Sequence, residues 1–423
     1  MKKMSILYRP INMVAIVNIM AFGLLYIYKA KFDEKLLSAG FLITVMVIAT
    51  YIVITRRGMG DEYLFLVVAM LANLGVLMIY RLDPVQGFKQ IVWYVIGIIL
   101  FFISYFVYLT FHRWDELIYQ YIGSAFALFL LTLVFGSNIK GANNWIVIGR
   151  YSFQPSELIK VIFIFFLAAY FHKPKKLAVR LNVRGTDIRI SERVILTAVS
   201  YMFMGFLVLQ RDWGSALLFF AIFFMFLYVL DTRLDYLAAN LALAAFGATA
   251  GYLTLYHIRV RFETWWDPWA DIAKKGYQIT QSLFAIAAGG FFGKGIGMGR
   301  PDFIPEVQTD FIFSAICEEM GIFGGAAVIL LFFLLTYRGF KVALEEKQLF
   351  EKAVALGITV MFGFQTFIII GGVIKLIPLT GITLPFISYG GSSMTTSFIA
   401  LGILQAISKH TGNRKEEEAD DSQ

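Results

Sequence analysis

Residues 63–80 read YLFLVVAMLANLGVLMIY, a run without a single Asp, Glu, Lys or Arg. About 20 largely apolar residues are enough to cross the hydrocarbon core of a bilayer as an α-helix. The rest of the 423-residue chain is similar, because 59% of its residues are hydrophobic and only 16% are charged, whereas ordinary globular domains carry about 25% charged residues. This composition excludes a set of water-soluble domains, and also disorder outside the tail 409–423. It predicts an all-α polytopic membrane protein.

The same apolar pattern recurs along the chain and predicts about twelve membrane-spanning helices. They cover roughly residues 11–28, 36–54, 63–80, 89–110, 117–135, 156–171, 194–210, 213–230, 234–256, 310–337, 353–374 and 390–408. The start of the chain resembles a signal peptide without a small-residue cleavage site, so we interpret it as a retained first helix. Broken hydrophobic segments in matching positions of two halves, typical of many secondary transporters, are absent, which disfavours a transporter.

Basic residues predict the orientation of the spans. Segment 172–193 carries seven Lys and Arg residues, so we expect it on the cytoplasmic side, and twelve spans then place both termini inside. Six further basic residues lie in the long segment 257–309, on the predicted outer side, with three Trp residues and many Gly residues. Its apolar part, 277–299, is broken by Gly and predicts a re-entrant or interfacial element. The irregular part of the protein is therefore expected on its outer face.

The segment GANNWIVIGRYSFQPSELIK (141–160) brings charge to the start of a predicted span. Ser156 after Pro155 can begin a helix, so Glu157 and Lys160 would lie on one face of its first turn. One interpretation is a carboxylate favoured by the helix dipole, with a local ion pair. Because ionisable groups at membrane depth are costly and usually functional, we favour a role in a site or in shaping one.

The segment IPEVQTDFIFSAICEEMGIFGG (304–325) places Asp310 at the start of a long apolar helix. Asp310 could cap this helix, although Thr309 could do so instead, and it could act as a general base beside the basic loop. Glu318 and Glu319 follow about 12–13 Å further along the helix, beyond the spacing of about 6.5–9.5 Å in an inverting glycosidase. We interpret them as buried partners of Arg or Lys.

The segment IPLTGITLPFISYGGSSMTTS (377–397) combines two prolines, a Gly-Gly pair and a row of hydroxyls. Small and hydroxyl residues support close helix packing in membranes, and they could also line a polar site for a head group. The stretch GKGIGMG (293–299) matches neither the dinucleotide nor the P-loop spacing, so we expect no soluble-type nucleotide site and no nucleic-acid partner. The single cysteine, Cys317, excludes an internal disulfide, and the four histidines show no metal spacing.

These features together suit a lipid-linked anionic substrate. A diphosphate leaving group needs positive charge, which Arg, Lys or a divalent cation (Mg or Mn) can supply, and a single carboxylate can then serve as the base. Metal ligands of the protein itself are not predicted. The basic residues of the outer segment that we predict to bind substrate are Arg259, Arg261, Lys274 and Lys294.

Five groups of segments, in this order along about residues 63–408, closely resemble the SEDS (shape, elongation, division and sporulation) family, that is RodA, FtsW and SpoVE. They are GANNWI with FQPSELIK, QRDWGSALLFF, RFETWWDPWAD with GYQITQSLFAI, PEVQTDFIF with EEMG, and GITLPFISYGGSS. The resemblance implies a ten-helix core at 63–408, with the long extracellular loop before the tenth of the chain's twelve predicted helices. The chain would then add two N-terminal helices within 1–62 and a cytoplasmic tail, 409–423.

The resemblance also implies an activity. SEDS proteins are multi-pass proteins of the bacterial plasma membrane that polymerise lipid II into peptidoglycan glycan strands on the outer leaflet, together with a class B penicillin-binding protein that crosslinks the product. Asp310 matches the family aspartate regarded as catalytic. The positions that match functionally important family residues, and that we predict to bind substrate, are Trp145, Glu157, Lys160, Ser388, Gly390, Gly391 and Ser392.

The chain departs from the family at a few positions. The family often has Arg before the first-motif Trp, His before Thr-Asp and the sequence Pro-Asp-Leu-Gly, where this chain has Asn144, Gln308 and Arg211-Asp212-Trp213-Gly214. Two rival functions are a lipid II flippase and a scaffold that only positions a penicillin-binding protein. A flippase requires a charged path across the bilayer, whereas the informative charges here cluster on the predicted outer side.

Overall fold

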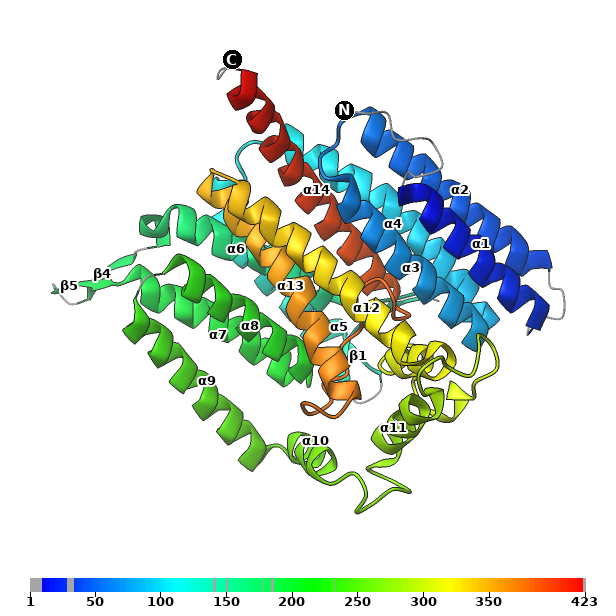
Figure 1. Ribbon diagram of the computed structural model, residues 1–423. Helices are drawn as coiled ribbons and strands as arrows, with labels where there is room; N and C mark the ends of the chain where they lie inside the picture. Colours follow the sequence, from blue (N-terminus) through cyan, green and yellow to red (C-terminus); the bar gives the residue numbers. More distant parts are fainter. Residues whose placement is uncertain are drawn as a thin grey trace. The chain divides into compact units, whose positions relative to one another are not determined.

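The structure is a computed structural model that describes residues 10–28, 34–139, 142–149, 151–177, 179–183, 186–231 and 233–420. This part of the chain contains fourteen α-helices (Figure 1). They are α1 (Pro10–Tyr28), α2 (Glu34–Arg56), α3 (Glu62–Leu82), α4 (Pro84–Thr110), α5 (Ile118–Phe135), α6 (Pro155–His172), α7 (Glu192–Leu209), α8 (Trp213–Leu230), α9 (Leu234–Thr254), α10 (Tyr256–Trp266), α11 (Tyr277–Gly289), α12 (Ile312–Glu345), α13 (Leu349–Val373) and α14 (Gly391–Asp420).

Within the described residues, eleven of these helices are long and apolar enough to cross a membrane, namely α1 to α9, α12 and α13. The prediction of a helical, polytopic membrane protein is therefore confirmed. The twelfth predicted span, 390–408, lies in α14, which falls outside this group because Gly, Ser and Thr residues lower the hydropathy of its first turns. Helix α11 has 13 residues, about 20 Å at 1.5 Å per residue, and is too short to cross a bilayer.

Short strands, which the sequence did not predict, form two sheets. Strands β1 (Ser137–Ile139), β2 (Ala142–Ile148) and β3 (Tyr151–Phe153) make a three-stranded antiparallel sheet in which Ile148 pairs with Tyr151. Gly149 has φ +63° in the tight β2–β3 turn, a left-handed conformation that favours glycine. Strands β4 (Val179–Val183) and β5 (Thr186–Ile190) form the second hairpin. Strands this short carry too little periodicity to be recognised among long apolar helices.

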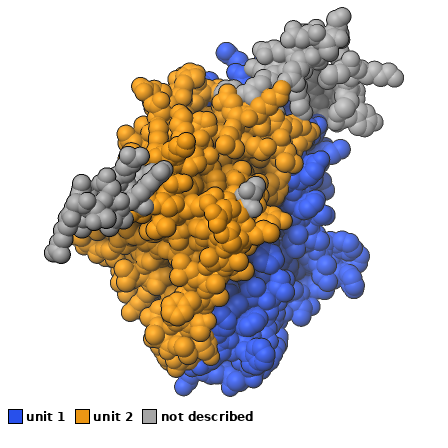
Figure 2. Space-filling model, turned by 90° about the vertical axis from the view of Figure 1, so that its left-hand side faces the viewer, with its two compact units in different colours: residues 1–106, 260–338, 365–423 blue, residues 107–259, 339–364 orange. Residues whose placement is uncertain are grey.

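The chain forms two compact units, coloured separately in Figure 2. Unit 1 comprises residues 1–106, 260–338 and 365–423, and unit 2 comprises residues 107–259 and 339–364. The unit boundaries fall inside α4, α10, α12 and α13, so the units are compact bodies rather than sequential domains. The division into 1–62, 63–408 and 409–423 describes function along the sequence and stays a prediction.

In unit 1, the N-terminal helices α1 and α2 lie beside α3 (Figure 1). Their contact depends on small and polar residues: Asn18 donates a hydrogen bond to Thr44 at 2.5 Å, and Thr44 donates to the carbonyl of Gly40 at 2.7 Å. A Cβ atom at Gly40 would lie 2.7 Å from the ring of Phe22. At this point α1 and α2 pack so closely that only a glycine fits at position 40.

Helix α14 is buried in unit 1 against α3 and α4. Ser104 of α4 donates to the carbonyl of Ile399 at 3.1 Å, and the rings of Tyr94 and Phe398 lie 5.4 Å apart. Ser392 and Ser393 are buried at its start. Because α14 faces protein along residues 391–408, its sequence does not need the apolar surface that a lipid-facing helix requires.

Helix α12 is broken at Gly321, which has φ +69° inside the helix. The glycine-rich loop 289–300 runs along the break, and its backbone pairs with the groups that the break releases. These bonds are Lys294 N to Glu318 O (3.0 Å), Gly295 N to Glu319 O (2.9 Å) and Ile322 N to Gly290 O (2.9 Å). A helix break in a membrane protein is stable only when its backbone groups find partners in this way.

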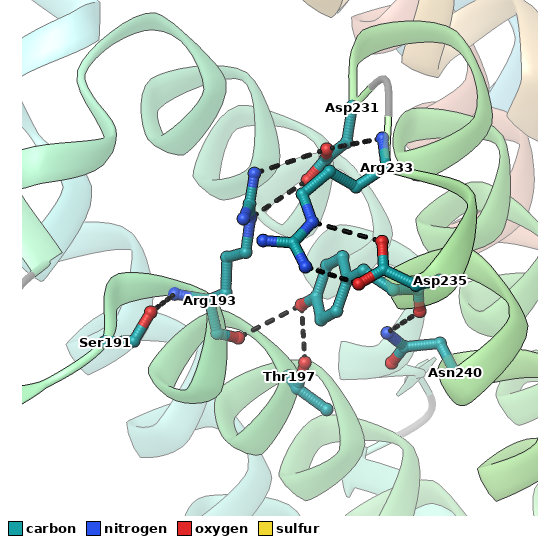
Figure 3. A network of polar contacts seen from close by, with 8 residues as sticks. Ser191, Arg193, Thr197, Asp231, Arg233, Asp235 and Asn240 are labelled. Carbon is teal, nitrogen blue, oxygen red and sulfur yellow. Dashed lines mark hydrogen bonds and ion pairs between the residues drawn. The ribbon is translucent and has the colours of Figure 1, made fainter.

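In unit 2, a polar network joins the first turn of α9 to α7 and to the end of α8 (Figure 3). Arg193 of α7 pairs with Asp231 at 3.3 Å, and the Tyr236 hydroxyl donates to the carbonyl of Arg193 at 3.0 Å. Thr197 lies 2.6 Å from the same hydroxyl. The network fixes the beginning of α9, a helix whose remaining residues are mostly exposed.

Candidate functional site

Asp310 lies in the turn that leads into α12, two residues before the first helical residue, Ile312. Its N–H and that of Thr309 both donate to the carbonyl of Glu306 at 3.1 Å, and Glu306 adopts φ +59°. The Asp310 side chain is half-buried. The prediction that Asp310 stands at the head of a long apolar helix is confirmed, and the left-handed Glu306 shows that the turn before it is held under strain.

The C-terminal segment 377–390 is bonded directly to this turn. Ser388 donates its hydroxyl to the carbonyl of Thr309 at 2.5 Å and accepts a bond from Leu384 N at 2.9 Å. Tyr389 N donates to the carbonyl of Gln308 at 2.8 Å. The C-terminal segment, about eighty residues further along the sequence, therefore bonds the backbone carbonyls of the two residues before Asp310.

Arg261 and Asp310 meet at Gly381. A Cβ atom at Gly381 would lie 3.5 Å from Oδ2 of Asp310 and 3.6 Å from Nη2 of Arg261, and Gly381 has φ +76°. Arg261 Nη1 donates to the carbonyls of Leu379 and Thr380 at 3.1 and 2.6 Å. A carboxylate and a guanidinium thus border one small space that glycine keeps open, and the predicted residues Asp310, Arg261 and Ser388 are brought together.

The other predicted residues of the C-terminal motif contact α4. Gly390 N donates to the Gln90 side chain at 3.3 Å, and a Cβ atom at Gly391 would lie 2.4 Å from the ring of Trp93. Ser392 is buried in the first turn of α14. Gln90 and Trp93 were not predicted, because nothing in the apolar sequence of α4 shows which loop it meets.

Lys294 and the two buried glutamates form a separate group of ion pairs in unit 1. Lys294 pairs with Glu318 at 2.9 Å, and Arg81 of α3 pairs with Glu319, with side chains 1% and 0% exposed. Arg81 also bonds Asp302 at 3.0 Å. The expectation that Glu318 and Glu319 are buried partners of Arg or Lys is confirmed.

Lys274 is exposed in the segment before α11, so it carries charge on the surface of unit 1. A role of either Lys274 or Lys294 in binding substrate stays a prediction. For Lys294, that role would have to share the ammonium group with Glu318.

In unit 2, Lys160 and Glu157 form a buried ion pair of 2.8 Å in the first turn of α6, as their spacing predicted. Trp145 lies on β2, opposite Ser137 of β1, and is half-buried. Arg259 is exposed and donates to the carbonyl of Leu253 at 2.8 Å. Trp145 is thus part of the sheet next to α6, whereas Arg259 is on the surface near the end of α9.

Asp212, which the sequence analysis named only within a family motif and without a role, is a further buried residue of unit 2 and is 8% exposed. Its Oδ2 accepts bonds from Asn144 (2.9 Å), Gln154 (3.2 Å) and Ser156 (3.4 Å), and its Oδ1 caps α8 through Ser215 N at 3.1 Å. One carboxylate therefore joins β2 to the first turns of α6 and α8. Two signals in the sequence point to Asp212: an Asp before an apolar helix is typical of a helix cap, and the residue lies in the family segment QRDWGSALLFF.

Tyr389 and Asp115 lie outside the spans, and the fold shifts the pKa of each. Burial, and then the charge of Asp83, raise the pKa of Tyr389, so the phenol beside the C-terminal turn stays protonated at neutral pH. Burial also acts to raise the pKa of Asp115, but the hydrogen bond and charge of Lys173, with the charge of His172, outweigh it and hold that pKa below its ordinary value.

The described residues contain no group of three or more His, Cys, Asp and Glu side chains placed to hold a metal ion.

The fold and the site describe a multi-pass membrane protein with a carboxylate and a guanidinium at the end of a span. The family profile described as "Cell cycle protein" (FtsW/RodA/SpoVE) matches residues 61–413. The chain is 36% identical to peptidoglycan glycosyltransferase RodA of Mycobacterium leprae over 82% of this chain and 77% of the relative. It is 34% identical to stage V sporulation protein E of Bacillus subtilis over 84% and 99% of the two chains.

Its fold is similar to a chain from a solved structure on the structural coordination of polymerization and crosslinking by a peptidoglycan synthase complex. The TM-score is 0.68 at 29% identity, covering 83% of this chain and 98% of the other. The protein belongs to the FtsW/RodA/SpoVE (SEDS) family of peptidoglycan glycosyltransferases. The resemblance inferred from the sequence motifs is thereby confirmed.

Proposed function

We propose that this protein polymerises lipid II into peptidoglycan glycan strands on the outer leaflet of the bacterial plasma membrane, in elongation, division or sporulation. The observation that carries the proposal is the position of Asp310: a half-buried carboxylate, fixed by the C-terminal motif and bordered by Arg261 across the space at Gly381. Its relatives named peptidoglycan glycosyltransferases support the reaction class.

In the proposed reaction, Asp310 accepts the proton of the GlcNAc 4-hydroxyl of an acceptor lipid II. The hydroxyl oxygen then forms a bond to the anomeric carbon of the MurNAc at the reducing end of the growing chain. The bond between that carbon and the diphosphate oxygen breaks with inversion, and undecaprenyl diphosphate leaves with the electron pair. A carboxylate is a suitable base for the 4-hydroxyl proton. The positive charge of Arg261 near the same space would stabilise the negative charge that develops on the leaving diphosphate.

The order of the helices supports an outer-face site. If the basic segment 172–193 is cytoplasmic, then α7, α8 and α9 as successive spans carry residues 255–311 to the other side. Helices α12 and α13 then return the segment 374–390 to that same side. With α14 as the twelfth span, both termini are cytoplasmic.

A partner follows from the same comparison. The similar solved structure concerns a complex that couples polymerization to crosslinking. We therefore propose that this chain works with a class B penicillin-binding protein, which would crosslink the strands that the chain makes. Lipid II and the nascent glycan are its substrates.

Purified protein in detergent, given lipid II without a partner, tests the activity. We expect glycan polymer from the wild type and from Glu263→Gln, which alters an exposed carboxylate of the same unit. We expect a loss of at least about 100-fold with Asp310→Asn, because the base is removed while the side-chain volume is kept. Equal polymer from Asp310→Asn would reject the proposed base.

Lipid II translocation in liposomes without any polymer would favour a flippase, and growth supported by Asp310→Asn would favour a scaffold.

A further inference from the structure

Gln90 is a fully buried amide near the beginning of α4, with 0% of its surface exposed. Its Nε2 donates to the carbonyl of Ser388 at 3.2 Å, and its Oε1 accepts from Gly390 N at 3.3 Å. A buried amide in an apolar helix is costly unless both of its polar ends are bonded. Here both ends bond the backbone of the same short turn.

That turn is the one that holds the residues before Asp310. Ser388 donates its hydroxyl to Thr309 O, and Tyr389 N donates to Gln308 O. The bonds therefore run from α4 through 388–390 to 308–309, entirely within unit 1. Each link is a backbone or buried side-chain bond, so a displacement of the turn displaces the backbone that carries Asp310.

We propose that Gln90 is a positioning residue for Asp310: its amide fixes the turn 388–390, and this turn fixes the backbone at 308–310. The inference rests on the proposed function, because it gives Gln90 an effect on the reaction without contact to the substrate. The amide supplies one donor and one acceptor in a fixed geometry, which neither a hydrocarbon nor a carboxylate reproduces. A shift of about 1 Å in a reacting group can cost on the order of 100-fold in rate.

The test compares two buried glutamines that bond the same loop. Gln365 of α13 is also buried and donates to the carbonyl of Thr383 at 2.8 Å, five residues before Ser388. Gln90→Met and Gln365→Met each remove an amide at similar volume and should lower the apparent unfolding temperature by similar amounts. We expect Gln90→Met to lower kcat for lipid II polymerisation by about 10- to 100-fold, with KM changed less than about 3-fold. Gln365→Met should change kcat by less than about 3-fold.

Gln90→Glu adds a readout that a loss of stability alone would not give. When protonated, the introduced carboxyl presents a carbonyl and an O–H and can replace both bonds of the amide; when ionised, it repels the carbonyl of Ser388. The kcat of Gln90→Glu, divided by that of the wild type at the same pH, should therefore rise as the pH is lowered. A flat ratio would count against the proposal.

Hydrogen exchange separates this inference from the proposed function. We expect Gln90→Met to speed exchange in both 384–391 and 306–311, and Gln365→Met to leave 306–311 unchanged. Unchanged exchange at 306–311 in Gln90→Met, or equal kcat losses in the two Met variants, would overturn the positioning role. A wild type that makes no polymer would reject the proposed function, whereas the exchange result would still decide whether Gln90 holds the Asp310 turn.

Discussion

Replacement of Asp212 by Ala should destabilise unit 2 more than any exposed charge removal in the same unit. The substitution takes away the acceptor of Asn144 and Ser156, which are both buried, and the cap on Ser215 N. A buried donor left without an acceptor costs about 1–3 kcal/mol, and a lost cap costs about 1 kcal/mol. Gln154 is half-buried and can turn to water. The expected loss is therefore on the order of 4 kcal/mol.

The assay is thermal unfolding of the purified protein in detergent, with Asp235→Ala as the control. Asp235 pairs with Arg233 on the surface, where an ion pair contributes little. Asn144→Asp alone sets a second carboxylate against Asp212 and should destabilise. Combining it with Asp212→Asn exchanges donor and acceptor, so the double variant should recover part of the loss. The carboxylate of Asp212 does not join the three elements if Asp212→Ala unfolds at the same temperature as Asp235→Ala. The same conclusion follows if the double variant is no more stable than Asn144→Asp alone.

Three further predictions concern single contacts, each measured as the apparent unfolding temperature. Arg81→Met leaves its carboxylate partner in α12 buried and uncompensated and should cost about 3–5 kcal/mol; a loss no larger than for an exposed Arg would contradict this. Gly40→Leu should cost about 1–3 kcal/mol by overpacking, whereas Gly23→Leu, where a Cβ would meet nothing within 4 Å, should be nearly neutral. Because the pKa of Asp115 is lowered in the fold, its bond to Lys173 stabilises above the ordinary Asp pKa of about 3.9 and is lost at lower pH. The difference in apparent unfolding temperature between the wild type and Lys173→Met should therefore shrink below about pH 4. A difference that does not change with pH would reject a stabilising bond between Lys173 and ionised Asp115.

Features carried by local sequence were predictable. The spans follow from long apolar runs, and the Glu157–Lys160 pair follows from a spacing of three residues after a proline. The basic partners of the buried residues Glu318 and Glu319 follow from the cost of unpaired buried charge, although the sequence did not identify Arg81 as one of them.

Features that depend on tertiary contact were not predictable. The link from Gln90 to Ser388 joins residues about 300 positions apart, and no pattern within α4 indicates it. The helix break at Gly321 requires a second segment to bond the backbone groups that lose their helical partners. A glycine in an apolar run therefore does not by itself predict the break. For Lys294, sequence showed only a basic residue in a basic loop, whereas the structure pairs it with Glu318.

The burial of α14 has a consequence for biogenesis. Its first turns are rich in hydroxyls and glycine, so the segment would partition into lipid less readily than the other long helices do. Its place is created by the surfaces of α3 and α4, which are synthesised some three hundred residues earlier. Stable insertion of the last helix therefore depends on a receptor surface formed by the first third of the same chain, and a chain with a misassembled N-terminal half should fail to retain its C-terminal motif in the membrane.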